Sequence, residues 1–273
     1  MAKIAKDYYL TEVDKLPNSI YCTHDYMGED GIQPHQHVKD QLLYTEGGLV
    51  HVKVQDNTYF LPARHYMWIP AGLQHSIHPG SNTVTMRNLY FPKKQGNEAF
   101  AAQAGIFPVN ELLLQMLIFT RQWDGDIVPE QEAAFGFVSA LRLILPQLSQ
   151  NQLLLMLPIP TDKRLAQIIQ YMDDFMQDGV LLPQLAQHFG FSERSLSRLF
   201  KANIRMSFVQ YHTIQRMLKA LQLLLDHQME IKEVAALVGY NSIPTFSATF
   251  RKVLGTSPSA YAKRSDSLRK QPL

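Results

Sequence analysis

Cysteine is almost absent from this sequence of 273 residues, because Cys22 is the only one. A single thiol forms no internal disulfide and cannot supply the thiolates of a zinc finger, so a disulfide-stabilised secreted scaffold is excluded. No apolar run reaches the roughly 18–20 residues of a membrane-spanning helix. The opening segment MAKIAKDYYLTEVD lacks the apolar core of a signal peptide. We therefore expect a cytoplasmic protein with no membrane partner.

Charged residues are also scarce, at 18%, whereas hydrophobic residues reach 46%. This balance fits a globular chain and argues against disorder or a coiled coil. The net charge of +2 conceals two unlike halves. Residues 160–273 hold 15 Lys and Arg against 9 Asp and Glu, a balance of +6, whereas the rest hold 11 against 15, a balance of −4. Seven of the ten histidines lie between His24 and His78, so we expect the two halves to have different partners.

Residues 1–95 have the pattern of short β-strands separated by turns. The segment LVHVKV (49–54) alternates apolar and polar residues, as a half-buried antiparallel strand does. Neighbouring segments are rich in Val, Tyr, Ile and Thr and are bounded by Gly, Pro and Asn. This spacing predicts an antiparallel β-sandwich or barrel.

Residues 96–160 have a helical pattern instead. Asn110 is placed to cap a helix that runs from Glu111 to Trp123, and Pro129 opens a second helix that reaches Pro146. Both helices are apolar over a broad face, so they must pack on the barrel, on each other or on a second subunit. We interpret this region as a helical linker and dimerisation region, and we expect a homodimer.

Residues 161–264 are helical and contain an internal repeat. Leu182, Leu185 and Phe189 match Ile231, Val234 and Val238 at an offset of 49, and Ser192, Leu196 and Phe200 match Ser242, Phe246 and Phe250 at an offset of 50. Two copies are too few for a solenoid, which needs about three repeats or more to bury its core. We therefore expect two similar modules, followed by a flexible tail over residues 265–273.

Each module reads as a short helix, a tight turn and a second helix. In the first module Gly190 suits the left-handed turn position, and Ser192 is placed to cap the second helix. Leu196 and Phe200 face inward on that helix. The side chains left outside are Arg194, Ser195, Ser197, Arg198 and Lys201. Such a helix suits the major groove of double-stranded DNA, where arginine pairs with guanine O6 and N7.

These segments resemble the AraC/XylS family of bacterial transcription regulators, most clearly in IKEVAALVGYNSIPTFSATFRKVLGTSPSAY (231–261). The resemblance implies two helix-turn-helix motifs joined by a long helix at about Met206 to Leu225. It also implies that both recognition helices enter successive major grooves on one face of the DNA.

The second recognition helix offers a different set of side chains to the DNA. By the same resemblance these are Ile243, Pro244, Thr245, Ser247 and Ala248, with Lys252 near the phosphates. Ala248 stands where the first helix has Arg198, so we expect the first motif to carry most direct base readout. The second motif is then expected to hold phosphates and to touch thymine methyl groups.

Two segments near the front resemble the signature segments of a cupin barrel: PHQHVKDQLLYTEGG (34–48) and MWIPAGLQH (67–75). The resemblance implies a cupin-like sensor domain for a small-molecule effector. Three positions depart from the cupin pattern. Gln41 replaces the glutamate of metal cupins, Arg64 stands where glycine is usual, and Pro79 stands where asparagine is common.

Three histidines in these segments are candidate ligands for a metal. His35 and His37 are two apart on an expected strand and so share a face, and His75 is expected from a facing strand. Three imidazoles can hold a divalent transition metal. The alternative is a metal-free pocket in which polar groups hydrogen-bond the effector. The candidate effector-binding side chains are His35, His37, Gln41, Tyr44, Trp68 and His75, of which Tyr44 and Trp68, like Tyr90, have core packing as their alternative.

The whole sequence is typical of an α+β protein, with a cupin-like antiparallel β-barrel, a helical linker and an all-α domain that carries two helix-turn-helix motifs. We interpret it as a transcription regulator that binds DNA and a small molecule, with RNA polymerase as a further partner. One alternative is a metal-dependent cupin enzyme, a dioxygenase or isomerase, with an accessory helical domain. Gln41 and the duplicated module argue against an enzyme. Another alternative is a constitutive DNA-binding protein whose barrel serves only for assembly.

Overall fold

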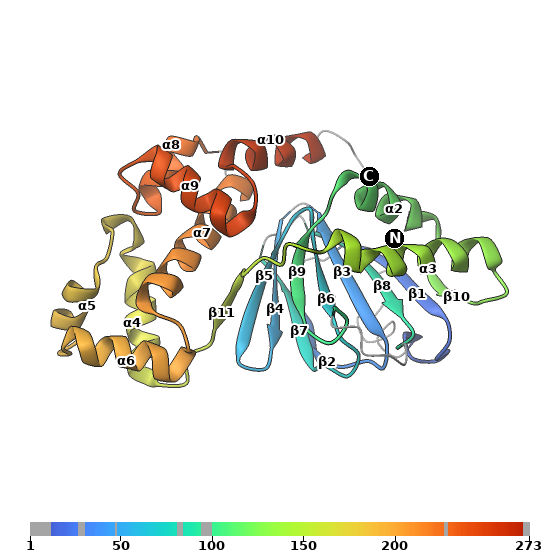
Figure 1. The fold of residues 1–273 in the computed structure, drawn as a ribbon, viewed down its shortest axis with the longest axis horizontal. Helices are drawn as coiled ribbons and strands as arrows, with labels where there is room; N and C mark the ends of the chain where they lie inside the picture. Colours follow the sequence, from blue (N-terminus) through green and yellow to red (C-terminus); the bar gives the residue numbers. More distant parts are fainter. Residues whose placement is uncertain are drawn as a thin grey trace. The chain divides into compact units, whose positions relative to one another are not determined.

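A computed structural model describes residues 12–26, 31–46, 48–80, 84–93, 100–226 and 229–269. The chain forms two compact units (Figure 1). The first comprises Met1–Gln55 and Leu61–Leu154, and the second comprises Asp56–Phe60 and Leu155–Leu273. In the described ranges, no helix combines the length and the apolar character needed to cross a bilayer.

The strands form two antiparallel sheets, which confirms the predicted antiparallel β-domain. The six-stranded sheet has the order β10-β1-β8-β3-β6-β9. Its strands are β1 (Ile20–Tyr26), β3 (Asp40–Glu46), β6 (His65–Ile69), β8 (Thr85–Phe91), β9 (Gly105–Pro108) and β10 (Gly125–Ile127). The five-stranded sheet has the order β11-β5-β4-β7-β2. Its strands are β2 (Ile32–His35), β4 (Leu49–Val54), β5 (Asn57–Pro62), β7 (His75–Pro79) and β11 (Met156–Pro158).

The region expected to be a purely helical linker also contributes strands. Strand β9 pairs with β6, and β10 pairs with β1, so both belong to the six-stranded sheet. Strand β11 lies in the apolar segment that follows the helices, where Met156 pairs with Tyr59 of β5. This pairing is the reason that residues 56–60 belong to the second unit.

The two predicted helices of this region are present and pack on the six-stranded sheet (Figure 1). Helix α2 (Glu111–Phe119) continues into the short 3-10 helix η1 (Thr120–Gln122), and helix α3 (Glu132–Leu148) contains Pro146. The Asn110 side chain caps α2 as predicted, since it accepts a hydrogen bond of 2.9 Å from the Leu113 amide. Their apolar faces share one core with the outer face of the sheet. That core includes Leu42, Tyr44, Trp68, Leu89, Leu113, Leu117, Val138 and Leu141.

The second unit contains the predicted repeat of helix pairs. Helices α5 (Leu182–His188) and α6 (Glu193–Ile204) form the first copy, and α8 (Ile231–Leu237) and α9 (Ile243–Leu254) form the second. Helix α7 (Phe208–Asp226) joins them, α4 (Lys163–Asp174) and the 3-10 helix η2 (Met176–Asp178) precede them, and α10 (Pro258–Arg269) follows. The predicted flexible tail is therefore wrong for residues 265–269, which are helical. Residues 270–273 lie outside the described residues.

A buried histidine makes the stability of the second unit depend on pH. His212 of α7 is 6% exposed, and its Nε2 has no partner among the described residues. Burial, with a smaller contribution from Arg216, lowers the pKa of His212 to about 4. The folded state therefore binds this proton less well than the unfolded chain, so stability falls as the pH drops below about 6.5.

We expect the buried His212 to lower the free energy of unfolding at pH 5.5 by about 1 kcal/mol relative to pH 7.5. Urea unfolding of the wild-type chain and of His212→Met at both pH values measures the part of the pH-dependent stability loss that comes from His212. The variant should lose less stability on acidification than the wild type by that amount. His188→Gln, at an exposed histidine of the same unit, serves as the control. An equal pH dependence of His212→Met and the wild type would contradict the assignment.

Candidate functional site

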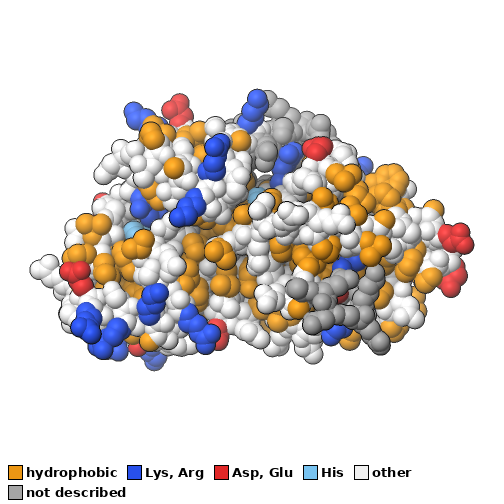
Figure 2. All heavy atoms as spheres, viewed as in Figure 1, with side chains coloured by type: hydrophobic (Ala, Val, Ile, Leu, Met, Phe, Trp, Pro, Cys, Tyr) orange, Lys and Arg blue, Asp and Glu red, His pale blue; other side chains and the backbone are white. Residues whose placement is uncertain are grey.

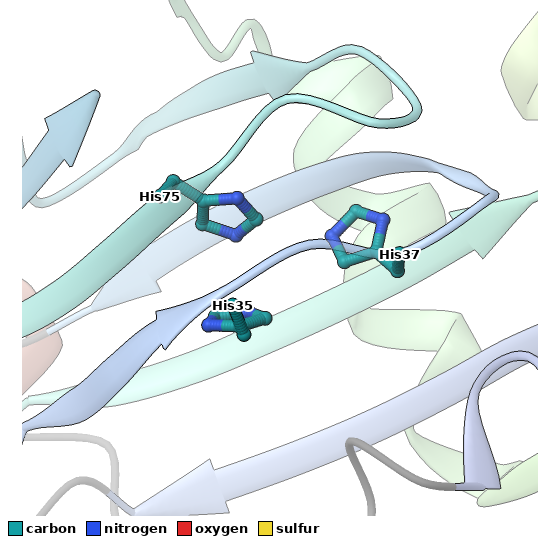
Figure 3. A group of neighbouring side chains, drawn as sticks. All are labelled: His35, His37 and His75. Carbon is teal, nitrogen blue, oxygen red and sulfur yellow. The ribbon is translucent and has the colours of Figure 1, made fainter. Parts of the chain in front are cut away.

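Three histidine rings meet at one end of the five-stranded sheet (Figure 3). His35 of β2 and His75 of β7 are directly paired across the two strands, and their ring centroids are 4.2 Å apart. The His37 ring lies 5.2 Å from the His75 ring and 6.0 Å from the His35 ring. One ring nitrogen of each histidine lies within 4.8 Å of the other two. The three side chains are thus close enough to share one ligand.

The rings converge by a different route from the one predicted. Strand β2 ends at His35, so His37 lies in the following turn rather than on the same face of a strand. His75 comes from the neighbouring strand of the same sheet and not from a facing sheet. The turn is held in place because the His37 carbonyl accepts a hydrogen bond of 2.8 Å from the Gly72 amide.

All three rings turn the same nitrogen toward the backbone. Nδ1 contacts a backbone carbonyl in each case: Gln33 for His35 at 2.8 Å, Lys39 for His37 at 2.6 Å and Leu73 for His75 at 2.8 Å. A carbonyl only accepts, so Nδ1 carries the hydrogen, and in the neutral rings of His35 and His75 Nε2 keeps its lone pair. Backbone partners of this kind fix the orientation of metal-binding histidines.

The free nitrogens of this cluster are buried. His35 Nε2 and His75 Nε2 have no hydrogen-bond partner among the described residues. Burial is the main cause that lowers the pKa of His75 to about 3, and burial also lowers the pKa of His35. Both rings are therefore neutral near pH 7. Two buried lone pairs without a donor are costly unless a ligand satisfies them.

The Nε2 atom of the third histidine, His37, contacts a chain of hydrogen-bonded side-chain amides. His37 Nε2 lies 3.1 Å from Gln41 Oε1, and Gln41 Nε2 donates to Asn88 Oδ1 at 2.8 Å and to the Tyr90 hydroxyl at 3.2 Å. The Tyr90 ring packs edge-on against His37 with centroids 5.0 Å apart. Asn88 Nδ2 is buried and has no partner within the described ranges. Gln41, a predicted site residue, thus contacts His37, and Asn88, which the sequence analysis did not single out, contacts Gln41.

Tyr44 and Trp68 lie on the opposite face of the six-stranded sheet, which corrects their placement in the effector site. Tyr44 alternates with Leu43 along β3, and Trp68 pairs with Leu42 across to β6, so both face the helices. The Tyr44 hydroxyl donates to Glu46 at 3.0 Å, and the Trp68 ring stacks on Phe91. Both are core residues, which was the alternative reading.

Helix α6 presents a basic surface. Arg194, Arg198 and Lys201 are exposed on it, and Lys and Arg side chains are visible over this region in Figure 2. Ser195 is engaged in the cap of the helix. Its hydroxyl accepts from the Ser192 amide at 3.0 Å and lies 2.9 Å from the Ser192 carbonyl. Arginine and lysine are thus the side chains of α6 that reach outward.

Helix α9 presents a less polar surface in its first turns. Ile243, Pro244, Thr245 and Ala248 are exposed, and Ser247 is half-buried. Ser242 caps the helix, and the Thr245 hydroxyl donates to Ser242 Oγ at 3.0 Å. The last turn is basic, with exposed Lys252 and Arg251. The sequence analysis did not single out Arg251, although this residue is equivalent to Lys201 in the internal repeat.

The turn of the second helix pair is fixed from α7. The Arg216 guanidinium lies 3.6 Å from the centroid of the Tyr240 ring, and its Nε donates to the Val238 carbonyl. Gly239 follows with a φ of +74°, and the equivalent Gly190 of the first pair has a φ of +72°. Both glycines occupy the left-handed region that the sequence predicted for Gly190.

Comparison with known families agrees with both halves of this description. Residues 185–264 match the family model described as a helix-turn-helix domain. Residues 17–156, about half of the chain, match the AraC-like ligand binding domain. The chain belongs to the AraC family.

Similar proteins include the HTH-type transcriptional regulator NimR of Escherichia coli K12. NimR is 27% identical over 245 residues, which cover 89% of this chain and 87% of NimR. The HTH-type transcriptional regulator GbdR of Pseudomonas aeruginosa is 34% identical over 95 residues, but that match spans 35% of this chain and 26% of GbdR. The solved C-terminal domain of AraT, a response regulator from Geobacillus stearothermophilus, is 32% identical with a TM-score of 0.37, and the match covers 38% of this chain and 86% of that domain. This AraC-type chain is a DNA-binding transcription regulator with an N-terminal ligand-binding domain.

Proposed function

We propose that this regulator binds its effector at the three-histidine site and that a divalent transition metal is part of that effector. The observation that carries the proposal is the pair of buried, unpartnered Nε2 atoms of His35 and His75 beside His37. The set fits a metal ion because each imidazole is oriented through Nδ1, and because Nε2 of His35 and of His75 has no hydrogen-bond partner among the described residues. Zn²⁺, Ni²⁺ and Cu²⁺ all accept such nitrogen ligands.

Removal of one ligand tests this site. We expect the wild-type chain to retain about one equivalent of Zn²⁺ or Ni²⁺ after equilibrium dialysis, and His75→Ala to bind the ion at least roughly 10–100-fold more weakly. Metal content is measured by mass spectrometry. His78→Ala is the matched control, since His78 lies on β7 but outside the cluster. A metal-free effector pocket, the second candidate, is favoured if wild type and His75→Ala bind equally little metal while a small molecule stabilises only the wild type.

We also propose that α6 and α9 enter successive major grooves of the operator. Support comes from the exposed Arg194, Arg198 and Lys201 on α6 and from the exposed apolar residues at the start of α9. Arginine discriminates between bases, whereas Ile243 and Ala248 suit thymine methyl groups. Binding to a labelled operator at several salt concentrations measures the number of phosphate contacts from the slope. A protein that ignores duplex DNA at low salt would contradict this proposal.

The proposed homodimer uses the outer faces of α2 and α3. Leu112 is 57% exposed, Phe119 is 53% exposed and Leu143 is 56% exposed. Hydrophobic side chains gather over these helices in Figure 2. A patch of this kind marks an interaction site. We expect sedimentation equilibrium at micromolar concentration to give a dimer, and Leu143→Glu to shift it toward monomer. Monomer alone in the wild type would contradict the proposal.

A buried ion pair connects the effector site to α3 and is proposed to transmit its state. Asp40 follows the His37 turn, accepts a hydrogen bond of 3.0 Å from the Ala71 amide and lies 3.5 Å from Arg142 of α3. The Arg142 guanidinium also lies 4.7 Å from the centroid of the Trp68 ring. An effector regulates only if it binds one arrangement of the protein better than another, and we propose that this ion pair couples the effector site to the position of α3.

The remaining proposals concern partners and compartment. Because the target is chromosomal DNA, we place the protein in the cytoplasm and infer RNA polymerase as its further partner. We assign the histidine site a sensing role rather than catalysis, since the curated relatives are named as transcription regulators.

A further inference from the structure

The three-histidine cluster provides no negative charge for a bound cation. Among the described residues, the cluster of metal-binding side chains contains only His35, His37 and His75, and no Asp or Glu. The groups that follow His37 into the domain are the neutral Gln41, Asn88 and Tyr90. A divalent ion bound there would carry two uncompensated charges in a buried place, which costs several kcal/mol.

The buried acids near the site are committed to other partners. Asp40 contacts Arg142 at 3.5 Å and the Ala71 amide at 3.0 Å. Glu46 lies 3.7 Å from Arg87 and accepts from the Tyr44 hydroxyl, on the helix-facing side of the sheet. The compensating charge must therefore come with the ligand.

The site also contains hydrogen-bond donors that suit an anion. Asn88 Nδ2 is buried without a partner in the described part of the chain, and it belongs to the same hydrogen-bonded chain as His37. Gln41 Nε2 already donates to Asn88 Oδ1 and to the Tyr90 hydroxyl, and so holds the Asn88 side chain in place. An amide N–H directed at an anionic oxygen makes a charge-assisted hydrogen bond. The buried Leu43, Met67 and Met86 occupy positions alongside Asn88, so the surroundings of this amide are apolar.

We infer that the effector of this regulator is a small carboxylate that binds together with the metal ion, with one carboxylate oxygen on the ion and another on the side-chain amide of Asn88. This inference rests on the proposed metal site and names the class of its second component. Ion and carboxylate then raise each other's affinity, because each supplies the charge that the other lacks.

The test uses the full-length chain with Co²⁺ as the ion, since its visible spectrum reports a change of ligand, and oxalate as the carboxylate probe. We expect oxalate to change the Co²⁺ spectrum and to tighten Co²⁺ binding roughly 10-fold or more. Acetamide, a neutral molecule of similar size, should have no effect. Inorganic phosphate and chloride are tested in parallel. If either anion tightens Co²⁺ binding as much as oxalate does, the assignment of the effector as a carboxylate is overturned.

Variants distinguish the carboxylate inference from the proposed metal site on which it rests. Asn88→Asp places a carboxylate in the site, so Co²⁺ should bind more tightly without oxalate, and oxalate should then change the affinity by less than about 3-fold. Gln41→Glu carries the same expectation if Asn88→Asp fails to fold. Asn203→Asp, in the second unit, is the matched control and should keep the full oxalate effect. Co²⁺ binding that is independent of oxalate in the wild type overturns this inference, whereas the absence of any Co²⁺ binding overturns the metal site itself.

Discussion

Gly239→Ala is expected to destabilise the second unit by about 3–5 kcal/mol, the largest effect of any single methyl group that we predict. A Cβ atom at this position would lie 2.4 Å from the Met176 carbonyl oxygen, which belongs to the backbone and cannot rotate away. The residue also has a φ of +74°, where an L side chain costs about 1–2 kcal/mol by itself. The two costs add because the substitution both strains the turn and pushes it away from η2.

Gly190→Ala separates these two costs. Gly190 occupies the equivalent turn of the first helix pair with a φ of +72°, but a Cβ there meets nothing within 4 Å. We therefore expect Gly190→Ala to cost only the conformational share of about 1–2 kcal/mol. Urea unfolding followed by circular dichroism compares both variants with the wild type. Equal losses in the two variants would show that the Met176 contact does not constrain the turn.

Arg198→Ala is expected to weaken specific operator binding by about 1–3 kcal/mol, or roughly 5–150-fold, and to relax selectivity at one base pair. Arg198 is exposed on α6 in the middle of the recognition surface, so its loss leaves the core of the unit unchanged. A bidentate arginine discriminates against every base except guanine. Competition with operators mutated one base pair at a time measures both effects.

Lys201→Ala is the control for Arg198→Ala. Lys201 lies in the last turn of α6, where it suits a phosphate rather than a base. Its loss should weaken all duplexes evenly and reduce the slope of affinity against salt by about one phosphate contact. If Arg198→Ala binds its operator as tightly as the wild type, α6 is not the reading helix.

The helical half of the fold follows from signals that are local in the sequence. Ser192 and Asn110 accept hydrogen bonds from the first turns of α6 and α2, as capping residues do. Gly190 adopts the left-handed conformation that ends a helix. Caps and turns depend on a few neighbouring residues, so one sequence is enough to place them. The internal repeat then fixed the second copy from the first.

The arrangement of side chains in the candidate effector site could not be predicted fully, because it depends on tertiary features that have no local signal in the sequence. All seven residues of β3 are buried, so DQLLYTE shows no alternation that would separate Gln41 and Leu43 from Leu42 and Tyr44. Pairing of β2 with β7 is irregular between Ile32 and His35, which changed the route by which His37 reaches the cluster. The short strands β9 and β10, of four and three residues, are too short for a periodic pattern. Tertiary pairing decided each of these points.

Helix α7 lies between the two helix-turn-helix motifs, and over its 19 residues the chain is one continuous helix. One residue inserted in its middle would rotate one motif against the other by about 100° and displace it by about 1.5 Å. If both motifs contact bases as we propose, the length of α7 limits the spacing between the two groups of base pairs that an operator offers them. Under this constraint, single base substitutions in a target promoter change its affinity for the regulator gradually. An insertion or deletion between the two groups of contacted base pairs abolishes simultaneous binding by both motifs.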